Sequence, residues 1–163
     1  MAGKDKKGEA RDRVIASNRV ARRDYEIIDE MECGIVLRGS EVKSLREARA
    51  RLNEAFARVV RDELWLVGLH IPPYTYGVGF GAHDPDRQRK LLAHRHEIRR
   101  WAALAEQQRL TMVPLSLYFK DGKVKVALAL GRGRRQYDKR QALARRDADL
   151  EARRAIAAAA KGR

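Results

Sequence analysis

The chain has 163 residues, of which 44% are hydrophobic and 36% are charged, and its formal net charge at pH 7 is +14. This length suits one globular domain with tails, and the apolar share is enough for one core. No apolar run approaches the roughly 20 residues that cross a bilayer, and the single cysteine, Cys33, excludes an intramolecular disulfide. We therefore expect a cytoplasmic monomer without a membrane partner.

The positive charge lies mainly at the two ends of the chain. Residues 1–23 carry 8 Lys and Arg against 3 Asp and Glu, residues 132–163 carry 11 against 4, and the residues between carry 17 against 15. Lys and Arg that neutralise phosphates release condensed counterions, so such arms add affinity for nucleic acid. A membrane surface is disfavoured because neither end has the Trp, Phe and Leu face of an interfacial helix.

The elements expected in the first half of the chain follow a basic arm, residues 1–14, which we expect to be disordered. A strand opens at Tyr25, with a bend over residues 31–34 and a return strand over 35–37. Ser40 can cap a short helix. Two apolar runs, 55–60 and 64–69, surround an acidic turn at residues 62–63 and predict a hairpin.

The second half begins with three glycines within residues 76–83, which predict a mobile loop. A helix capped by Asp84 or Asp86 is expected next, with an apolar face that begins at Leu91. Apolar residues then alternate over 113–119 and 124–130, around the two-residue turn Asp121-Gly122. Three hairpin-like units with helices between them predict a mainly β fold, a small closed antiparallel β-barrel with flanking α-helices over residues 15–131.

The basic C-terminal tail, residues 132–163, has few large aliphatic side chains, so it cannot bury enough apolar surface to offset the entropy of ordering. Its alanines and arginines still favour helix intrinsically. We expect a tail that is disordered when free and helical when bound.

Patterns typical of catalysis or metal binding are weak. His94 and His96 are two apart on a predicted helix, which separates them onto different faces. The three acids Glu32, Glu41 and Glu63 lie in turn-like contexts, where a surface acid is the default. We expect a binding protein rather than an enzyme, with no catalytic residues, metal or cofactor.

Several basic, amide and aromatic residues are candidates for contacts with RNA. The segment 18–23 holds an amide and three arginines, including Asn18, Arg19 and Arg22. Lys43 and Arg46 lie three apart on the short helix, and Lys125 stands on the polar side of its strand. The alternatives are a solvated arm, pairing of the helix cations with Glu47 or Glu41, and a lysine that only protects a sheet edge. Aromatic stacking on bases is open to Tyr74, Tyr76 and Tyr137.

Five strings occur in the order typical of one known family: NRVARRDYEI, ECGIVLRGSEVKSLREA, DPDRQRKLLAHRHEI, TMVPLSLYFKDGKVKVALALGRGRR and YDKR. On these strings, the chain closely resembles the SsrA-binding proteins (small protein B) of bacterial trans-translation, from about Ile15 to Arg154.

The resemblance implies a barrel of oligonucleotide-binding (OB) type that binds the tRNA-like domain of transfer-messenger RNA. It also implies delivery of that RNA to stalled 70S ribosomes. There the C-terminal tail would enter the empty mRNA channel at the decoding centre of 16S rRNA and become helical, so that the nascent chain is tagged for degradation.

By the same resemblance, the RNA-binding positions fall on Asn18, Glu32, Leu92 and Lys125. Leu92 could instead pack the predicted helix. Further candidates for the phosphate surface are Arg19, Arg22, Lys43, Arg46, Arg89 and Lys90. The ribosome-binding tail positions are Gly133, Arg134, Arg135, Tyr137, Asp138, Lys139 and Arg140, with Tyr137 where other members carry histidine.

Two alternatives remain open. A generic RNA-binding or ribosomal OB-fold protein would explain the charge but not the tail string. An RNA-processing enzyme would need a cluster of acids or a metal constellation, which the sequence does not display.

Overall fold

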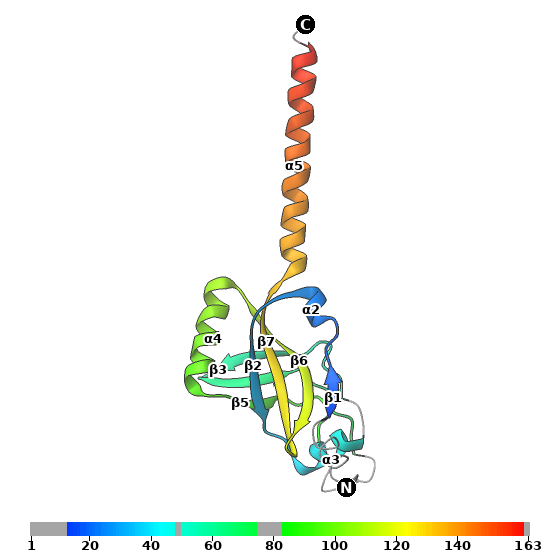
Figure 1. Ribbon diagram of the computed structural model, residues 1–163, viewed down its shortest axis with the longest axis vertical. Coiled ribbons are helices and arrows are strands. Elements are labelled where there is room, and N and C mark those ends of the chain that lie inside the picture. The colour runs from blue at the N-terminus through cyan, green and yellow to red at the C-terminus, as the bar shows by residue number, and fades with distance from the viewer. Residues whose placement is uncertain (1–12, 48–49, 75–82, 162–163) are drawn as a thin grey trace, which may run out of the picture. The chain divides into compact units, whose positions relative to one another are not determined.

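The computed structural model describes residues 13–47, 50–74 and 83–161 (Figure 1). The chain divides into two compact units, Met1–Arg132 and Gly133–Arg163. Most of the expected basic arm and of the loop at residues 76–83 lies outside the described residues.

The first unit is mainly β, as predicted, with seven strands among the described residues that pair antiparallel. The strands are β1 (Val14–Ser17), β2 (Tyr25–Ile35), β3 (Phe56–Val60), β4 (Glu63–Val67), β5 (Arg89–Leu92), β6 (Thr111–Lys120) and β7 (Lys123–Gly133). Their order in the sheet is β1-β6-β3-β4-β5-β2-β7, and β6 pairs with β7 as well. The last strand in this order, β7, therefore also pairs with the second strand, β6.

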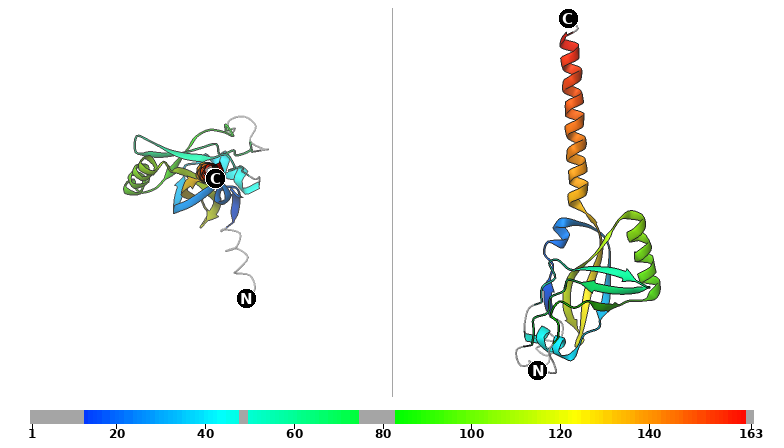
Figure 2. Two further views of the ribbon diagram at one scale, coloured as in Figure 1. Left: turned by 90° about the horizontal axis from the view of Figure 1, so that it is seen from above. Right: turned by 180° about the vertical axis from the view of Figure 1, so that it is seen from behind.

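Three described helices flank this sheet: α2 (Ala21–Asp24), α3 (Gly39–Glu47) and α4 (Arg95–Gln108). Figure 1 and the right-hand view of Figure 2 show α4 along one side of the sheet, with α2 and α3 at opposite ends of it. Ile98 and Trp101 are the buried residues of α4, which confirms the prediction that they share the face of a helix that packs on the body of the protein.

The hairpin of β6 and β7 forms as its alternation predicts. Leu117, Val126 and Leu128 are fully buried in the core. The turn residues Asp121 and Gly122 both have positive φ, 51° and 77°. This backbone twist suits a two-residue hairpin turn, for which Asp-Gly is a preferred sequence.

Two expectations about strands are wrong. Residues 31–34 do not bend, because β2 continues through them to Ile35. Gly34 instead allows close approach of a neighbouring strand: a Cβ at this position would lie 3.2 Å from the Cβ of Leu92. The hairpin of β3 and β4 forms, but its turn is not at residues 62–63 as expected. The turn residues with positive φ are Arg61 and Asp62, and Glu63 already belongs to β4.

The expected helix from Asp84 or Asp86 is also wrong, because β5 occupies Arg89–Leu92 and α4 begins only at Arg95. Leu91 is buried from a strand, not from a helix. With four residues, β5 is too short for its alternation to be recognised in the sequence. Leu91 also lies two helical turns before Ile98, so its spacing fits a helix that begins earlier than α4 does.

Helix α3 forms where expected, but its N-terminus is not capped by Ser40. The Ser40 hydroxyl pairs with Nδ1 of His83 at 3.0 Å. The backbone N–H of Arg38 donates to a carboxylate oxygen of Glu41 at 2.9 Å, the backward contact of a capping box.

The second unit holds helix α5 (Arg134–Lys161), whose described side chains at residues 144–161 are all exposed. The expectation that the free tail is disordered concerns the protein in solution, and it stays a prediction. Among the described residues, no helix combines the length and apolar character that crossing a membrane requires.

Candidate nucleic-acid interface

Glu32 lies on the outward face of β2 and is held by two side chains of β6. The Tyr118 hydroxyl donates to its Oε2, and Nζ of Lys120 lies 3.3 Å from both carboxylate oxygens. The hydrogen bond from Tyr118 lowers the pKa of Glu32 most, and Lys120 and Lys125 lower it further, against a smaller opposing effect of burial. The carboxylate is therefore charged and oriented at neutral pH.

Lys125 belongs to the same cluster. It lies on β7 directly opposite Tyr118 of β6, and its side chain is half-buried. Burial and the hydrogen bond to Glu32 both raise the pKa of Tyr118, so its hydroxyl stays protonated and donates. A carboxylate that accepts, a phenol and two ammonium groups thus lie together, and they suit recognition of phosphates and base edges.

Leu92 joins this face from β5. It pairs with Gly34 in the β2–β5 register, and Gly34 is two residues from Glu32 on the same side of β2. Leu92 is half exposed and belongs to strand β5, whose last residue it is, rather than to a helix. Leu92 therefore does not belong to the predicted helix, and half of its surface is exposed.

Asn18 is not presented in the same way, since its side chain is only 7% exposed. Its Nδ2 donates to the carbonyl of Pro114 at 3.1 Å, and its backbone N–H donates to the carbonyl of Leu115 at 2.8 Å. Its Oδ1 is buried without a hydrogen-bond partner among the described residues. The structure thus gives Asn18 a role in fixing the start of α2 against β6.

Four further basic candidates are exposed: Arg19, Arg22, Lys43 and Arg46. Arg22 pairs with Glu30 at 2.9 Å, in contact with solvent, where an ion pair contributes little to stability. Nζ of Lys43 lies 6.0 Å from the ring centroid of Tyr74. Within the described chain, neither Lys43 nor Arg46 forms an ion pair with Glu41 or Glu47, so that alternative is not supported.

Arg89 is the candidate that the structure corrects, because its side chain is completely buried. Its Nε donates to Glu41 at 2.5 Å, and its Nη1 donates to the carbonyl of Leu69 at 2.6 Å. The guanidinium therefore has no free surface for a phosphate. Its neighbour Lys90 is half-buried on the opposite side of β5 and pairs with Glu63 at 3.4 Å.

Glu41, expected on the surface, is also completely buried, and its carboxylate lies between two arginines. Arg87 donates to its Oε1 and Arg89 to its Oε2. Burial raises the pKa of Glu41, but the hydrogen bonds from Arg87, the Arg38 N–H and Arg89 outweigh burial and lower it. This cluster anchors α3 to β5 and has a structural role.

The tail residues predicted to bind the ribosome begin at Gly133, which ends β7, and at Arg134, which is exposed at the start of α5. The side chains of Arg135, Tyr137, Asp138, Lys139 and Arg140 lie outside the described part of the structure. Their roles stay predictions.

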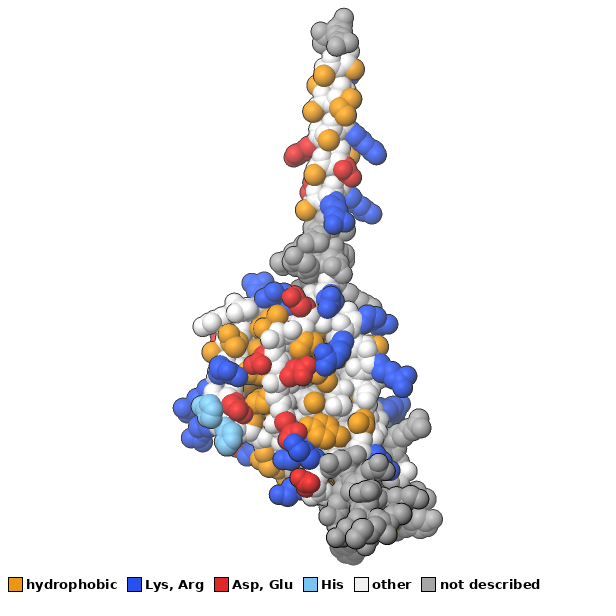
Figure 3. Space-filling view, viewed as in Figure 1, with side chains coloured by type: hydrophobic (Ala, Val, Ile, Leu, Met, Phe, Trp, Pro, Cys, Tyr) orange, Lys and Arg blue, Asp and Glu red, His pale blue; other side chains and the backbone are white. Residues whose placement is uncertain are grey.

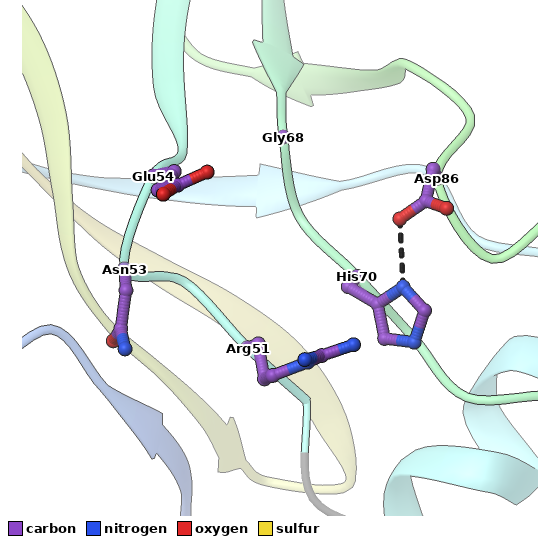
Figure 4. Close-up of a pocket in the computed structure, with 6 residues that line it drawn as sticks. All are labelled: Arg51, Asn53, Glu54, Gly68, His70 and Asp86. Carbon is purple, nitrogen blue, oxygen red and sulfur yellow. Dashed lines mark hydrogen bonds and ion pairs between the residues drawn. The ribbon is translucent and has the colours of Figure 1, made fainter.

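A polar cavity of about 340 Å³ lies elsewhere in the first unit (Figure 4). Its lining residues are Arg51, Asn53, Glu54, Gly68, His70 and Asp86. The dashed line in Figure 4 joins Nδ1 of His70 to Asp86 at 2.7 Å. None of the predicted RNA-binding residues is among those that line it, and the described residues hold no cluster of acids, His and Cys suited to a metal ion.

The surface is not uniformly basic. On the face in Figure 3, Asp and Glu side chains lie among those of Lys and Arg, with apolar side chains between them. Binding there would depend on particular contacts more than on overall charge. Sequence reasoning missed Tyr118 and Lys120 as neighbours of Glu32, although both stand on the polar side of the β6 alternation.

Comparisons with known proteins agree with one another. The family model described as SmpB protein matches residues 15–158. The SsrA-binding protein of Frankia casuarinae is 52% identical over 93% of this chain and 94% of its own length. The SsrA-binding protein of Nocardia farcinica is 54% identical over 92% and 93%, respectively.

A solved chain from the structure described as "tmRNA-SmpB: a journey to the center of the bacterial ribosome" is 49% identical. It aligns with a TM-score of 0.61 over 72% of this chain and 82% of its own.

Proposed function

Because the chain belongs to the SmpB protein family, we propose that it is the RNA-binding adaptor of trans-translation in the cytoplasm of its host. In this proposal, the sheet of the first unit is an OB-type barrel closed by the β6–β7 pairing, and it binds the tRNA-like domain of transfer-messenger RNA. The protein delivers this RNA to stalled ribosomes and has no catalytic step of its own.

The observation that supports RNA binding best is the common outward face of Glu32, Leu92 and Lys125 on β2, β5 and β7. These three residues are far apart in the sequence, and the fold brings them to neighbouring strands. Together they offer an acceptor, an apolar surface and a cation, the combination needed to read RNA shape rather than only its charge.

The tail has a separate role in the proposal. The second unit carries helix α5, whose described side chains at residues 144–161 are all exposed. We propose that it becomes fully ordered in the vacant mRNA channel, where the basic residues from Arg134 to Arg140 contact 16S rRNA.

The test compares binding of the purified chain to transfer-messenger RNA, ordinary tRNA and a random RNA of equal length at near-physiological salt. A second chain lacks residues 134–163, a cut that leaves β7 whole. We expect selective binding to transfer-messenger RNA by both chains, and tagging of stalled products only by the full chain. Equal, steeply salt-dependent binding to all three RNAs would instead support a generic RNA-binding protein.

A further inference from the structure

Trp65 is an aromatic residue on the outer face of the sheet. Along β4, Leu64 and Leu66 are buried in the core, whereas Trp65 between them points outward and is half-buried. The other tryptophan, Trp101, is fully buried and donates its indole N–H to Asp29 at 3.0 Å. Trp65 does not belong to the buried core, and among the described residues no hydrogen bond involves its indole N–H.

Cationic side chains flank Trp65 on both neighbouring strands. Arg58 of β3 and Lys90 of β5 are each its direct partner in the sheet register. Side chains of such partners start about 5 Å apart on the same face. Arg58 donates to Gln88 at 3.0 Å, and Lys90 pairs with Glu63 at 3.4 Å. Both contacts are accessible to solvent and can be exchanged for contacts with a phosphate.

A hollow of about 410 Å³ opens beside the indole. Its lining residues are Arg58, Val60, Arg61, Glu63, Trp65 and Gln88. This volume lies within the range of about 300–1,000 Å³ of small-ligand pockets. Arg61 adds a further cation at its rim, where its positive φ of 52° fixes the hairpin turn.

We propose that Trp65 is a stacking platform for one unpaired base of the bound RNA, with Arg58 and Arg61 on the adjoining phosphates. An aromatic face that stacks on a base, next to arginines that neutralise phosphate, is the usual chemistry of single-stranded RNA sites. The inference rests on the proposed function and extends its site. Lys90 and Leu92 lie on the same side of β5, so the hollow continues the face of Glu32, Leu92 and Lys125.

The charge of the hollow favours RNA over an apolar protein segment as its occupant. Three of the cations near Trp65 are Arg58, Arg61 and Lys90, against one acid, Glu63, in the part of the chain described. Lys90 already pairs with Glu63, whereas Arg58 and Arg61 form no ion pair among the described residues. A protein segment that docked on Trp65 would leave these two arginines without an anionic partner unless it were acidic.

The test uses the full chain with Trp65→Ala, Trp65→Phe and, as a control, Val67→Ala. Val67 is half-buried on the same side of β4 but does not line the hollow. Affinity for the tRNA-like domain is measured by fluorescence anisotropy, and thermal unfolding confirms that each variant is folded. We expect about a tenfold loss of affinity for Trp65→Ala, near-native binding for Trp65→Phe, and no change for Val67→Ala.

Intrinsic fluorescence gives a second readout that a purely structural role would not alter. Stacked RNA should quench the wild-type emission, and this quenching should vanish in Trp65→Phe because Trp101 is fully buried. Native affinity of Trp65→Ala, without quenching in the wild type, would overturn the inference while leaving the proposed function intact. Failure of the wild type to bind the tRNA-like domain would overturn both.

Discussion

The Tyr118 hydroxyl on β6 donates a hydrogen bond to Glu32 on β2, across the strand that separates them. The intervening strand is β7, whose Lys125 lies directly opposite Tyr118. The two partners therefore enclose the lysine on the outer face of the sheet. The hydrogen bond fixes the orientation of Glu32 and Tyr118 before any RNA arrives, which reduces the entropy cost of binding.

The first prediction concerns the charge of Glu32. Removal of the hydroxyl in Tyr118→Phe should raise the pKa of Glu32, because the hydrogen bond from Tyr118 is the main cause of its lowering. In the wild type, the stabilisation from this carboxylate is present above its unfolded-state pKa and is lost as the pH falls through the lowered folded-state pKa. NMR titration of the side-chain carboxyl measures the change. An identical titration curve in the variant would refute the assignment.

The second prediction separates a specific lysine from general charge. Lys125→Ala should weaken binding to the tRNA-like domain by about 1–3 kcal/mol, because a positioned contact is lost. Glu32→Ala should weaken binding by a similar amount, because Tyr118 and Lys120 both lose the carboxylate to which they donate. The matched control is Lys123→Ala, at the exposed start of the same strand. Equal losses for Lys123 and Lys125 would show that only charge matters.

The sequence predicts the β6–β7 hairpin well because its period of two and its Asp-Gly turn are both local signals. It fails for β5, since the alternation of four residues, with Arg89 and Leu91 inward, is hidden beside a long helix. The local sequence around Gly34 predicts a bend, whereas in the fold this glycine allows the close approach of Leu92. That contact depends on strand pairing, which no local pattern reveals.

In the candidate site too, local sequence patterns do not reveal contacts between distant segments of the chain. Glu32, Leu92 and Lys125 were expected from the resemblance, and the fold places them on one face. The prediction that Arg89 contacts phosphate is wrong, because its side chain is buried. In the sequence, an arginine next to a lysine in a basic chain suggests an exposed side chain. Its burial depends on Glu41, which approaches from a helix 48 residues earlier.

The third prediction concerns this buried ion cluster. Glu41→Gln should lower the free energy of unfolding by about 3–5 kcal/mol, because it leaves Arg87 and Arg89 without their carboxylate. Urea unfolding followed by circular dichroism measures the loss. Glu47→Gln is the control, an exposed acid on the same helix, and it should change stability by less than about 0.5 kcal/mol. A cluster without structural weight would give equal values for both variants.

The fourth prediction concerns Cys33, which is buried on β2, next to Glu32 in the strand. Burial raises the pKa of its thiol to about 12, and the carboxylates of Glu97 and Glu32 contribute further. Since the thiolate is the reactive form, the folded protein at pH 8 should react with a thiol reagent far more slowly than a free cysteine. The unfolded chain in urea should react at the free rate. Fast labelling of the folded protein would show that Cys33 is accessible.

The last prediction concerns the tail in solution. In helix α5, the described side chains at residues 144–161 are exposed, so only intrinsic propensity and local charge pairs favour the helix without a partner. Residues 132–163 also carry 11 Lys and Arg against 4 Asp and Glu, and the excess positive charges repel one another. A synthetic peptide of residues 133–163 should therefore show a mainly coil-like circular dichroism spectrum in buffer. It should gain helix when bound to vacant ribosomes, where rRNA phosphates neutralise its cations. A peptide that is already fully helical at 25 °C would show that the tail enters the ribosome preformed.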